Sequence, residues 1–457
     1  MHIHILGICG TFMGGIAVLA REMGVTVTGS DSNPYPPMST QLEELGIKVN
    51  RYDAANLDPQ PDIVVIGNAL SRGNPEVEVV LERDMNYISG PQWLAEHFLR
   101  GRHVLAAAGT HGKTTTSSML AWILEHAGLE PGFLIGGIPQ NFGISARAGG
   151  GKYFVIEADE YDTAFFDKRS KFIHYHPRTL ILNNLEFDHA DIFADLDAIK
   201  QQFHFLVRTV PGSGKLVINA DDKDLQDVIK KGCWSEKTYF SIDNSANSEW
   251  QTVSLREDFS SFSVQRQGVE QGILEWPLMG AHNAANALSA IAAAAHIGIE
   301  PELAITALSR FRNVKRRMEV RGTINNITVY DDFAHHPTAI STTLEGLRKH
   351  CGDEKIIAVL EPRSNTMKMG VHKETLANSL KLADRVFVYK ADDVDWNMSE
   401  MTCGQIPLSI QTDINTLVDE VVSRSQPGDN ILVMSNGGFA GIHDKLLQGL
   451  EYKYSLT

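Results

Sequence analysis

Cysteine is scarce in this sequence, and its four residues lie far apart. Cys9, Cys233, Cys351 and Cys403 form no CxxC pair, so neither a disulfide framework nor a cysteine-ligated zinc site is indicated. Long apolar runs are also lacking, because no stretch approaches the ~18 residues that a membrane-spanning helix needs. The first residues lack the basic flank of a signal peptide. We therefore expect a reduced, cytoplasmic protein that does not enter a membrane.

Positive charge is in deficit. Lys and Arg number 41 against 56 Asp and Glu, which gives a formal net charge of −15. An acidic surface repels phosphate backbones, so binding to nucleic acid or to anionic membranes is not expected. A local basic pocket for a nucleotide is compatible with this charge. Hydrophobic residues make up 43% and charged residues 21%, as in ordinary globular proteins.

Apolar strands alternate with helices along the chain, which predicts an α/β fold with mostly parallel, doubly wound sheets. At ~150 residues per domain, the length of 457 residues predicts about three domains. We place them at 1–100 (Rossmann-like), 101–321 (central, nucleotide-binding) and 322–457 (Rossmann-like). Within the second, residues 235–278 alternate polar and apolar side chains, which predicts short antiparallel strands. No fixed-period repeat indicates a solenoid or propeller.

One segment has the pattern of a phosphate-binding loop. Its residues are Gly109, Thr110, His111, Gly112, Lys113, Thr114 and Thr115. The loop follows the apolar strand His103–Ala108 and precedes a helix, so its backbone N–H groups and the helix dipole favour a phosphate. Lys113 would reach the β- and γ-phosphates, and the Thr114 hydroxyl would bind Mg²⁺. The strict motif has glycine where this chain has Ala107.

Acidic and imidazole side chains follow two other strands of the same unit. Glu157 lies just beyond a strand predicted to end at Ile156, and His189 follows the strand at 179–182. Because the carboxyl ends of parallel strands meet at one edge of a sheet, Thr114, Glu157 and His189 should converge there. Their oxygen and nitrogen donors predict a magnesium site.

Two other classes of protein compete with this interpretation. Gly7, Gly10 and Gly14 with Asp31 imitate a dinucleotide fingerprint, which would favour a nicotinamide-dependent oxidoreductase. The spacing is not G-x-G-x-x-G, and the second glycine loop would remain unexplained. A nucleotide-dependent switch or transport ATPase would explain that loop, but it gives no reason for two further doubly wound domains.

Six motifs, in order along nearly the whole chain, resemble the Mur ligases, the ATP-dependent amide-forming enzymes of peptidoglycan synthesis. They occupy residues 109–115, 157–160, 188–191, 280–286, 316–317 and 331–337. The resemblance implies three domains, ATP and Mg²⁺. It also implies a reaction in which a carboxylate is first phosphorylated and then attacked by an amine.

The resemblance also implies roles for individual residues. Catalysis would depend on Lys113, Glu157, His189 and Arg317. Thr114 and Glu157 would bind one Mg²⁺, and His189 would bind a second Mg²⁺. ATP would contact the loop 109–115 and, beyond it, His282, Asn283, Asn286, Arg317 and Asp332. UDP-N-acetylmuramate would contact Gly10, Thr11, Phe12, Met13, Gly14 and Asp31. The incoming peptide would contact Arg363, Asn365 and Asn436.

Residues 7–15 and 361–368 depart from the pattern of the branch that adds L-alanine. Together with residues 35–40, they resemble another branch of the family. That branch joins UDP-N-acetylmuramate to L-alanyl-γ-D-glutamyl-meso-diaminopimelate, a tripeptide recovered from old cell wall. The alternative is the branch that adds L-alanine.

Arg363 follows the strand 356–360, and a guanidinium fork suits a distant carboxylate. The plainer alternative is that it pairs with Glu361. A monomer or weak homodimer is expected.

Overall fold

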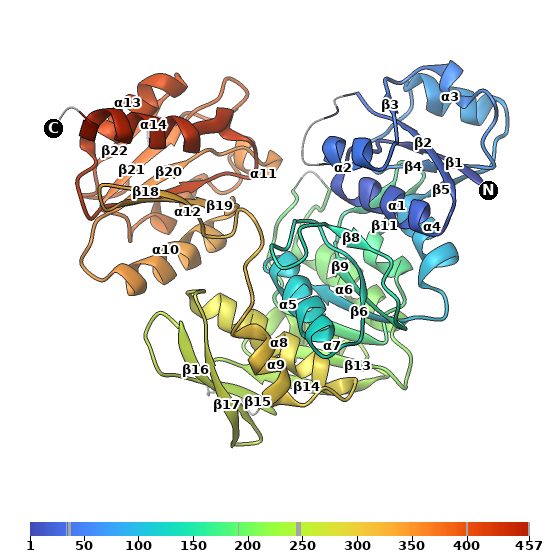
Figure 1. Ribbon diagram of the computed structural model, residues 1–457, viewed down its shortest axis with the longest axis horizontal. Coiled ribbons are helices and arrows are strands. Elements are labelled where there is room, and N and C mark those ends of the chain that lie inside the picture. The colour runs from blue at the N-terminus through green and yellow to red at the C-terminus, as the bar shows by residue number, and fades with distance from the viewer. Residues whose placement is uncertain (33, 35–37, 191, 244–247, 399–400, 456–457) are drawn as a thin grey trace.

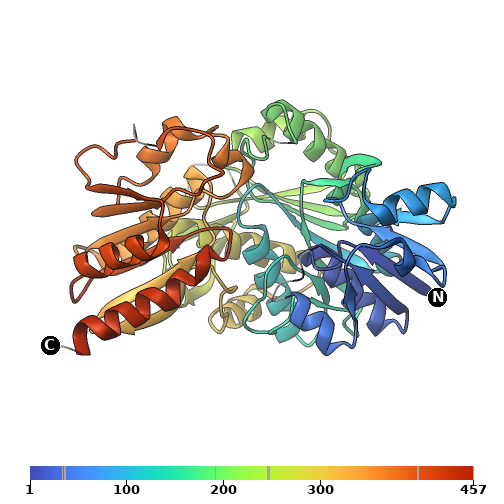
Figure 2. The ribbon, with the colours of Figure 1, turned by 90° about the horizontal axis from the view of Figure 1, so that it is seen from above.

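The computed structural model describes the chain except for residues 33, 35–37, 191, 244–247, 399–400 and 456–457. Part of the 35–40 segment and the last residue of the 188–191 motif therefore lie outside the described residues. Three successive sheets, each flanked by helices, confirm the predicted α/β architecture (Figure 1). The first and third units lie on either side of the central one, as the view from above also shows (Figure 2).

The first sheet is fully parallel and has the strand order β3-β2-β1-β4-β5. Its strands are β1 (His2–Leu6), β2 (Thr26–Ser30), β3 (Val49–Asn50), β4 (Ile63–Ile66) and β5 (Tyr87–Ser89). Its helical segments are α1 (Thr11–Glu22), α2 (Met38–Glu44), η1 (Ala54–Leu57), α3 (Pro75–Glu82), α4 (Gly90–Leu94) and η2 (Ala95–Leu99). This strand order is the doubly wound order of Rossmann-like domains.

The central sheet has the order β17-β16-β15-β14-β13-β12-β6-β9-β7-β8. Its strands are β6 (His103–Ala108), β7 (Gly132–Leu134), β8 (Ala146–Arg147), β9 (Tyr153–Ala158), β12 (Thr179–Leu182), β13 (Lys215–Asn219), β14 (Glu236–Ser241), β15 (Trp250–Ser254), β16 (Ser261–Arg266) and β17 (Val269–Glu275). A separate hairpin joins β10 (Asp162–Ala164) to β11 (Asp167–Ser170). The helical segments are α5 (Lys113–His126), η3 (Lys171–His174), α6 (Leu196–Thr209), α7 (Lys223–Lys230), α8 (Ala281–His296) and α9 (Pro301–Leu308).

The prediction for residues 235–278 is only partly correct. β15, β16 and β17 pair in antiparallel fashion, as expected. β14, however, pairs in parallel with β13 and with β15, so it continues the main sheet. The helix α7 returns the chain before β14, and such a crossover gives a parallel neighbour.

The third sheet has the order β18-β19-β23-β20-β21-β22, with only β18 antiparallel. Its strands are β18 (Glu319–Ile324), β19 (Ile327–Asp332), β20 (Ile356–Leu360), β21 (Arg385–Tyr389), β22 (Leu408–Gln411) and β23 (Asn430–Met434). Its helical segments are α10 (Pro337–Cys351), α11 (Asn365–Lys368), α12 (Lys373–Ser379), α13 (Ile414–Arg424), η5 (Phe439–Gly441) and α14 (Ile442–Ser455). No helix in the described parts of the chain is long and apolar enough to cross a membrane.

Alternate residues of β6 face two different cores. Val104 and Ala106 pack in a core that also contains residues of α1, α4 and α6, whereas Leu105 and Ala107 pack against α5 and α8. Both faces of the strand are therefore covered, as parallel sheets require. The first of these cores is continuous from the first unit into the central one, so these two units pack directly on each other.

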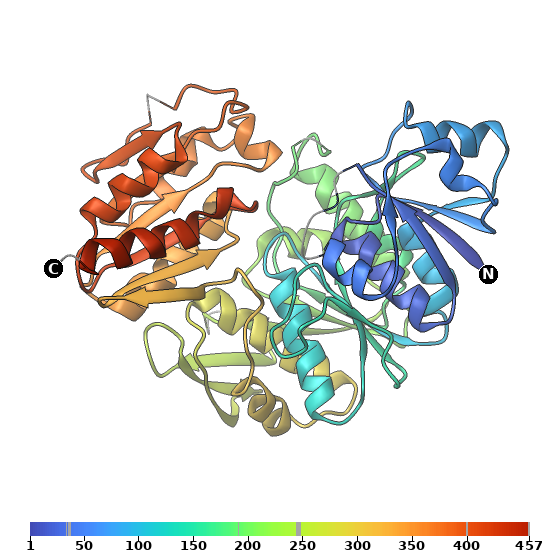
Figure 3. The same cartoon turned by 45° about the horizontal axis from the view of Figure 1, so that its top comes forward.

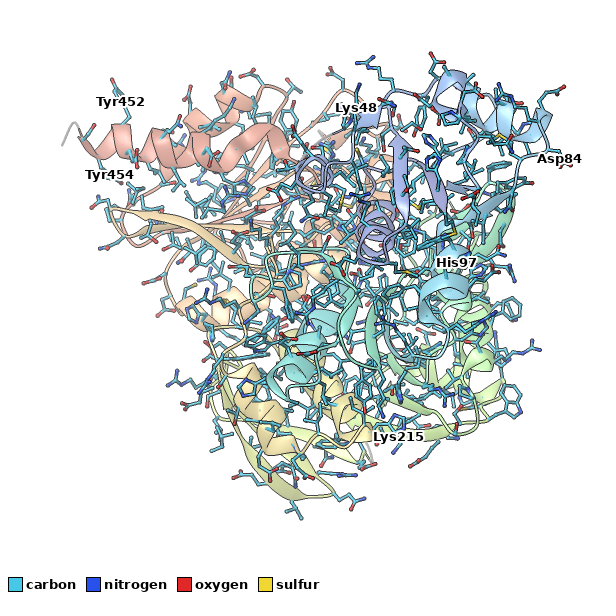
Figure 4. All side chains as sticks on the ribbon, turned by 45° about the vertical axis from the view of Figure 1, so that its right-hand side comes forward. Lys48, Asp84, His97, Lys215, Tyr452 and Tyr454 are labelled. Atoms are coloured by element: carbon cyan, nitrogen blue, oxygen red, sulfur yellow. The ribbon has the colours of Figure 1, made fainter. Side chains whose placement is uncertain are left out.

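The central unit lies between the first and third units (Figure 3), and its parallel strands β6, β9 and β12 end at one edge of the sheet. In the register of the sheet, Ala108 of β6 pairs with Ala158 of β9 and with Leu182 of β12. The segments that follow these strands therefore start at the same edge. The amino ends of the strands lie on the outer face, where Lys215 marks the start of β13 (Figure 4).

Candidate active site

The glycine loop after β6 depends on two glycines with positive φ. Gly109 has φ 152° and Gly112 has φ 79°, and a Cβ on Gly112 would lie only 2.5 Å from Oδ1 of Asn286. A side chain is therefore excluded at residue 112. Asn184 holds the loop from the next strand, since its Oδ1 accepts from the His111 N–H at 2.7 Å. The helix α5 begins at Lys113, so the last three residues of the 109–115 motif lie on its first turn.

Lys113 is paired with a buried carboxylate. Its Nζ lies 2.6 Å from Oε2 of Glu160, and the lysine side chain is 12% exposed against 2% for the glutamate. Oε1 of Glu160 lies 3.2 Å from Nε2 of His189. Burial opposes ionisation of Glu160, yet Lys113 and His189 outweigh it and lower its pKa to about 2. One carboxylate therefore links the loop lysine to the predicted metal ligand His189.

The other two predicted metal ligands contact each other. The Thr114 hydroxyl donates to Oε1 of Glu157 at 2.9 Å, and the Gly136 N–H donates to Oε2 at 2.7 Å. Burial raises the pKa of Glu157, and the Gly136 hydrogen bond opposes this. Contrary to prediction, Glu157 lies on β9, which continues past Ile156 to Ala158. The Glu157 carboxylate and the Thr114 hydroxyl, completed by phosphate oxygens, form a donor set that fits Mg²⁺.

A more compact cluster joins the glycine loop to the third unit. Nε2 of His111 lies 3.3 Å, and Nδ1 of His336 3.6 Å, from Oε2 of Glu186. The Thr338 hydroxyl donates to the same oxygen at 2.8 Å. Within the described ranges, His111, Glu186 and His336 are the one group of three His, Cys, Asp or Glu whose ligand atoms lie within 4.8 Å of one another. Burial opposes the ionisation of Glu186, but His111 and Thr338 lower its pKa to about 2.

The predicted adenine residues lie on the first turns of α8, beside the glycine loop. Oδ1 of Asn286 accepts from Nδ2 of Asn183 at 2.6 Å and from the Thr116 hydroxyl at 3.1 Å. The amide of Asn283 donates to the Met279 carbonyl at 2.8 Å. Both asparagines are buried, so they fasten α8 to its surroundings.

His282 differs from these asparagines. Its Nδ1 is buried and has no hydrogen-bond partner among the described residues. Burial lowers the pKa of His282 to about 4, so the ring is neutral at pH 7. A neutral imidazole with a free nitrogen suits an uncharged base such as adenine better than a phosphate.

Arg317 and Asp332 lie where the third unit meets the central one. Asp332 accepts from the Met318 and Ala334 N–H groups, both at 2.8 Å. Burial raises the pKa of Asp332, and the charge of Arg317 opposes this. The Arg317 guanidinium lies 4.9 Å from the centre of the Phe333 ring, and its side chain has no hydrogen-bond acceptor in the part of the chain described. It is therefore available for a phosphate.

In the first unit, α1 begins at Thr11, directly after Gly10. Its first N–H groups follow Gly10, which has an extended backbone. A Cβ on Gly14 would lie 2.1 Å from the Met38 sulfur, so glycine is required there. Oδ2 of Asp31 accepts from the Cys9 N–H at 2.9 Å. The exposed N-terminus of α1 is a favourable place for a phosphate.

The three predicted peptide residues line one cavity of about 200 Å³. Its lining also includes Tyr161 and His189 of the central unit. Arg363 has a side chain 51% exposed, and its Nη1 lies 3.7 Å from Oε1 of Glu361. That distance exceeds a hydrogen bond, so the surface pair considered as the plainer alternative is present only as a long contact.

Asn365 and Asn436 line the same cavity as Arg363. Asn436 has a buried Oδ1 without a partner among the described residues. A Cβ on Gly437 would lie 2.3 Å from Cδ of Arg363, so the arginine stem packs directly over this glycine. The cavity therefore brings third-unit polar groups next to His189 of the central unit.

Three family models match the chain almost from end to end. They are "Mur ligase family, catalytic domain" over residues 2–102, "Mur ligase middle domain" over 107–294 and "Mur ligase, glutamate ligase domain" over 316–437.

The chain belongs to the Mur ligase family.

Similar members of the family are known by activity. The chain is 58% identical over 457 residues to the UDP-N-acetylmuramate–L-alanyl-γ-D-glutamyl-meso-2,6-diaminoheptandioate ligase of Escherichia coli K12, covering 99% of each protein. A UDP-N-acetylmuramate–L-alanine ligase of Renibacterium salmoninarum is 31% identical over 443 residues, with 95% of this chain and 93% of that protein covered.

Solved Mur ligase structures share the fold. The murein peptide ligase of Psychrobacter arcticus 273-4 is 48% identical and superposes with a TM-score of 0.77 over 98% of both chains. A UDP-N-acetylmuramate–alanine ligase of Thermotoga maritima gives 0.78 over the whole of both chains at 23% identity, which shows the fold alone.

Two acidic residues of this Mur ligase site were not assigned from the sequence. Glu160 is the last residue of the 157–160 motif, so the motif could have identified it as a site residue. The spacing of the sequence does not show that it pairs with Lys113 and His189. Glu186 precedes the 188–191 motif and contacts residues of the third unit. Lys200 follows the 188–191 motif on α6, and its Nζ pairs with Oδ1 of Asp224 at 2.6 Å. It is a structural lysine in this fold.

Proposed function

We propose that this Mur ligase joins UDP-N-acetylmuramate to L-alanyl-γ-D-glutamyl-meso-diaminopimelate, with ATP as the energy source and ADP as a product. The observation that carries the proposal is the cavity in which Arg363, Asn365 and Asn436 meet His189 of the ATP-binding unit. The identities of 58% and 56% to two ligases named for this tripeptide support it, against 31% for an L-alanine ligase.

The reaction needs activation, because a carboxylate does not condense with an amine in water. The lactyl carboxylate of muramic acid attacks the γ-phosphorus of ATP, which forms an acyl phosphate and releases ADP. The alanine amine of the peptide then attacks the acyl carbon, loses a proton, and inorganic phosphate leaves. Phosphoryl transfer depends on positioning and charge neutralisation, and Lys113 and Arg317 supply positive charge. The loop 109–115 holds the triphosphate.

Thr114 and Glu157 are proposed to hold one Mg²⁺, and His189 is proposed to hold a second. A bound Mg²⁺ would neutralise the charge of the transferring phosphoryl group. The Thr114–Glu157 hydrogen bond and the Gly136 N–H orient the carboxylate toward the phosphate loop. Glu160 orients His189. These side chains lie at or just beyond the carboxyl ends of three neighbouring strands, β12, β6 and β9, which supports a single site.

The remaining substrate contacts divide among the three units, which we bound at 1–100, 101–321 and 322–457. Adenine lies against His282, Asn283 and Asn286, while Asp332 orients Arg317. The UDP-muramate contacts are Gly10, Thr11, Phe12, Met13, Gly14 and Asp31, with the diphosphate at the N-terminus of α1. The peptide contacts are Arg363, Asn365 and Asn436.

This function places the protein in cell-wall recycling in the cytoplasm, where both nucleotides are available. We assign it as a monomer or weak homodimer without nucleic-acid or membrane partners. The four cysteines are free thiols, which agrees with a reducing compartment.

Mass analysis of the ligation product tests the function. The protein is incubated with ATP, Mg²⁺, UDP-N-acetylmuramate and the tripeptide, and the expected products are UDP-N-acetylmuramoyl-tripeptide and ADP in equal amounts. A reaction that forms only ADP, without the amide, would contradict the proposed function.

A further inference from the structure

Lys171 is a buried lysine outside every motif discussed above. It begins the short helix η3, and the residue is 7% exposed. Its Nζ lies 3.3 Å from Oδ2 of Asp159. The same atom lies 5.5 Å from the ring centre of Phe12 and 5.4 Å from that of Tyr161.

These partners offset only part of the cost of burying the ammonium group of Lys171. Lysine is almost never fully buried unless it is paired, and here the one carboxylate within hydrogen-bond range is at 3.3 Å and is itself 27% exposed. Ring faces attract a cation, but they accept no strong hydrogen bond. An ammonium has three N–H donors, and the bond to Asp159 is the one that the lysine side chain makes to the described residues. Two donors therefore remain for a ligand.

The two rings place Lys171 between the two ends of a substrate. Phe12 lies on the first turn of α1, where the diphosphate of UDP-muramate is assigned. Tyr161 lines the cavity, and its ring centre lies 4.2 Å from that of His189. A muramyl group extending from the first unit to the phosphate loop would pass between these rings.

We propose that Lys171 is a positioning residue that binds an anionic group of UDP-muramate, either its diphosphate or its lactyl carboxylate. The inference rests on the proposed function for the identity of the substrate. Both groups present acceptor oxygens with negative charge, which form strong hydrogen bonds with an ammonium. Binding by Lys171 would fix the sugar with its lactyl arm directed at the phosphate loop.

The alternative is a purely structural role for Lys171. In that case the lysine serves only to pair with Asp159. The backbone of this segment has its own anchor, because the Lys171 N–H donates to the Tyr161 carbonyl at 2.9 Å. Replacing the side chain therefore leaves this local hydrogen bond in place, and a substitution at residue 171 is expected to fold.

Calorimetric titration of UDP-N-acetylmuramate without ATP tests the proposal in the full-length chain. Lys171→Met should bind the substrate roughly ten- to a hundred-fold more weakly, as expected for loss of a charge-assisted hydrogen bond. Lys171→Arg should retain part of the affinity, and ATP affinity should not change. Lys168→Met is the matched control, since Lys168 is on the neighbouring β11 strand and its side chain is 69% exposed.

A second variant separates ligand binding from the ion pair. Asp159→Asn removes the competing carboxylate but keeps the lysine, so UDP-N-acetylmuramate should bind as tightly as to the wild type or more tightly. Unchanged affinity in Lys171→Met, or an equal loss in Asp159→Asn and Lys171→Met, would overturn the proposal.

UDP-N-acetylglucosamine distinguishes the two anionic groups, because it has the diphosphate but no lactyl carboxylate. If Lys171→Met weakens both ligands equally, the lysine binds the diphosphate; if it weakens only UDP-N-acetylmuramate, it binds the lactyl carboxylate. Because these titrations need no turnover, failure of the wild type to ligate the tripeptide would count against the proposed function and not against Lys171.

Discussion

Lys113 and Glu160 form an ion pair between the phosphate loop and the segment after β9, with Nζ 2.6 Å from Oε2. The residues are 47 positions apart in sequence. The other oxygen of Glu160 faces His189, so this carboxylate holds the loop lysine and the proposed metal ligand in a fixed arrangement. The loop lysine and the proposed metal ligand are thereby held in place by one carboxylate.

Glu160→Gln should destabilise the protein. The substitution keeps the shape of the side chain but leaves Lys113 without its counter-charge in a largely buried place, which typically costs about 3 kcal/mol. A fall in the thermal unfolding midpoint would show it. The double variant Glu160→Gln/Lys113→Met should recover much of the loss; if it unfolds as early as the single variant, the two charges are not coupled.

Lys113→Ala should abolish ligation; the protein should still fold, although less stably, because the buried Glu160 keeps only His189 as a partner. In the proposed site, Lys113 is the loop residue that reaches the β- and γ-phosphates. Single-turnover formation of acyl phosphate measures the chemical step, and circular dichroism measures the fold. Normal turnover in this variant would remove the ATP-site assignment.

Glu157→Ala and His189→Ala should raise the Mg²⁺ concentration needed for half-maximal rate and lower kcat. The side chains flank the phosphate loop, where an ion would meet the γ-phosphate. Glu236→Ala is the control, because Glu236 lies at the amino end of β14, whereas the proposed site lies at the carboxyl ends of the strands. Mg²⁺ titrations that superimpose for all four proteins would contradict the metal site.

Arg363→Ala should raise KM for the tripeptide about ten- to a hundred-fold, as expected for loss of a charge-assisted hydrogen bond. KM for ATP and UDP-N-acetylmuramate should remain as in the wild type. Arg424→Ala, an exposed arginine of α13 in the same unit, is the control. An equal shift of all three constants would show that Arg363 is structural.

Glu186 should make stability depend on acid pH. Its pKa is about 2 in the folded protein against 4.5 ordinarily, so its contribution is complete above pH ~4.5 and is lost as the pH falls toward 2. The difference in unfolding midpoint between the wild type and Glu186→Gln should therefore shrink below pH 4.5. A difference that stays constant from pH 7 to pH 3 would contradict this contact with Thr338 and His111.

Local patterns carried the prediction of the phosphate loop, since strand, glycines and helix are contiguous from His103 to His126. Contacts between distant segments could not be predicted this way. Glu160, Glu186 and Lys171 each acquire their partners only when other strands or units pack against them. β14 was assigned wrongly for the same reason, because its alternating pattern fits either direction and only the crossover through α7 decides it.

Mass spectrometry of one competition reaction tests the central claim most directly. The protein receives ATP, Mg²⁺, equimolar L-alanine and tripeptide, and UDP-N-acetylmuramate with ¹⁸O in its lactyl carboxylate. The account predicts a UDP-N-acetylmuramoyl-tripeptide product and one ¹⁸O atom in each inorganic phosphate, because the acyl phosphate passes a carboxylate oxygen to phosphorus. A predominant L-alanine adduct, or phosphate without ¹⁸O, would contradict it.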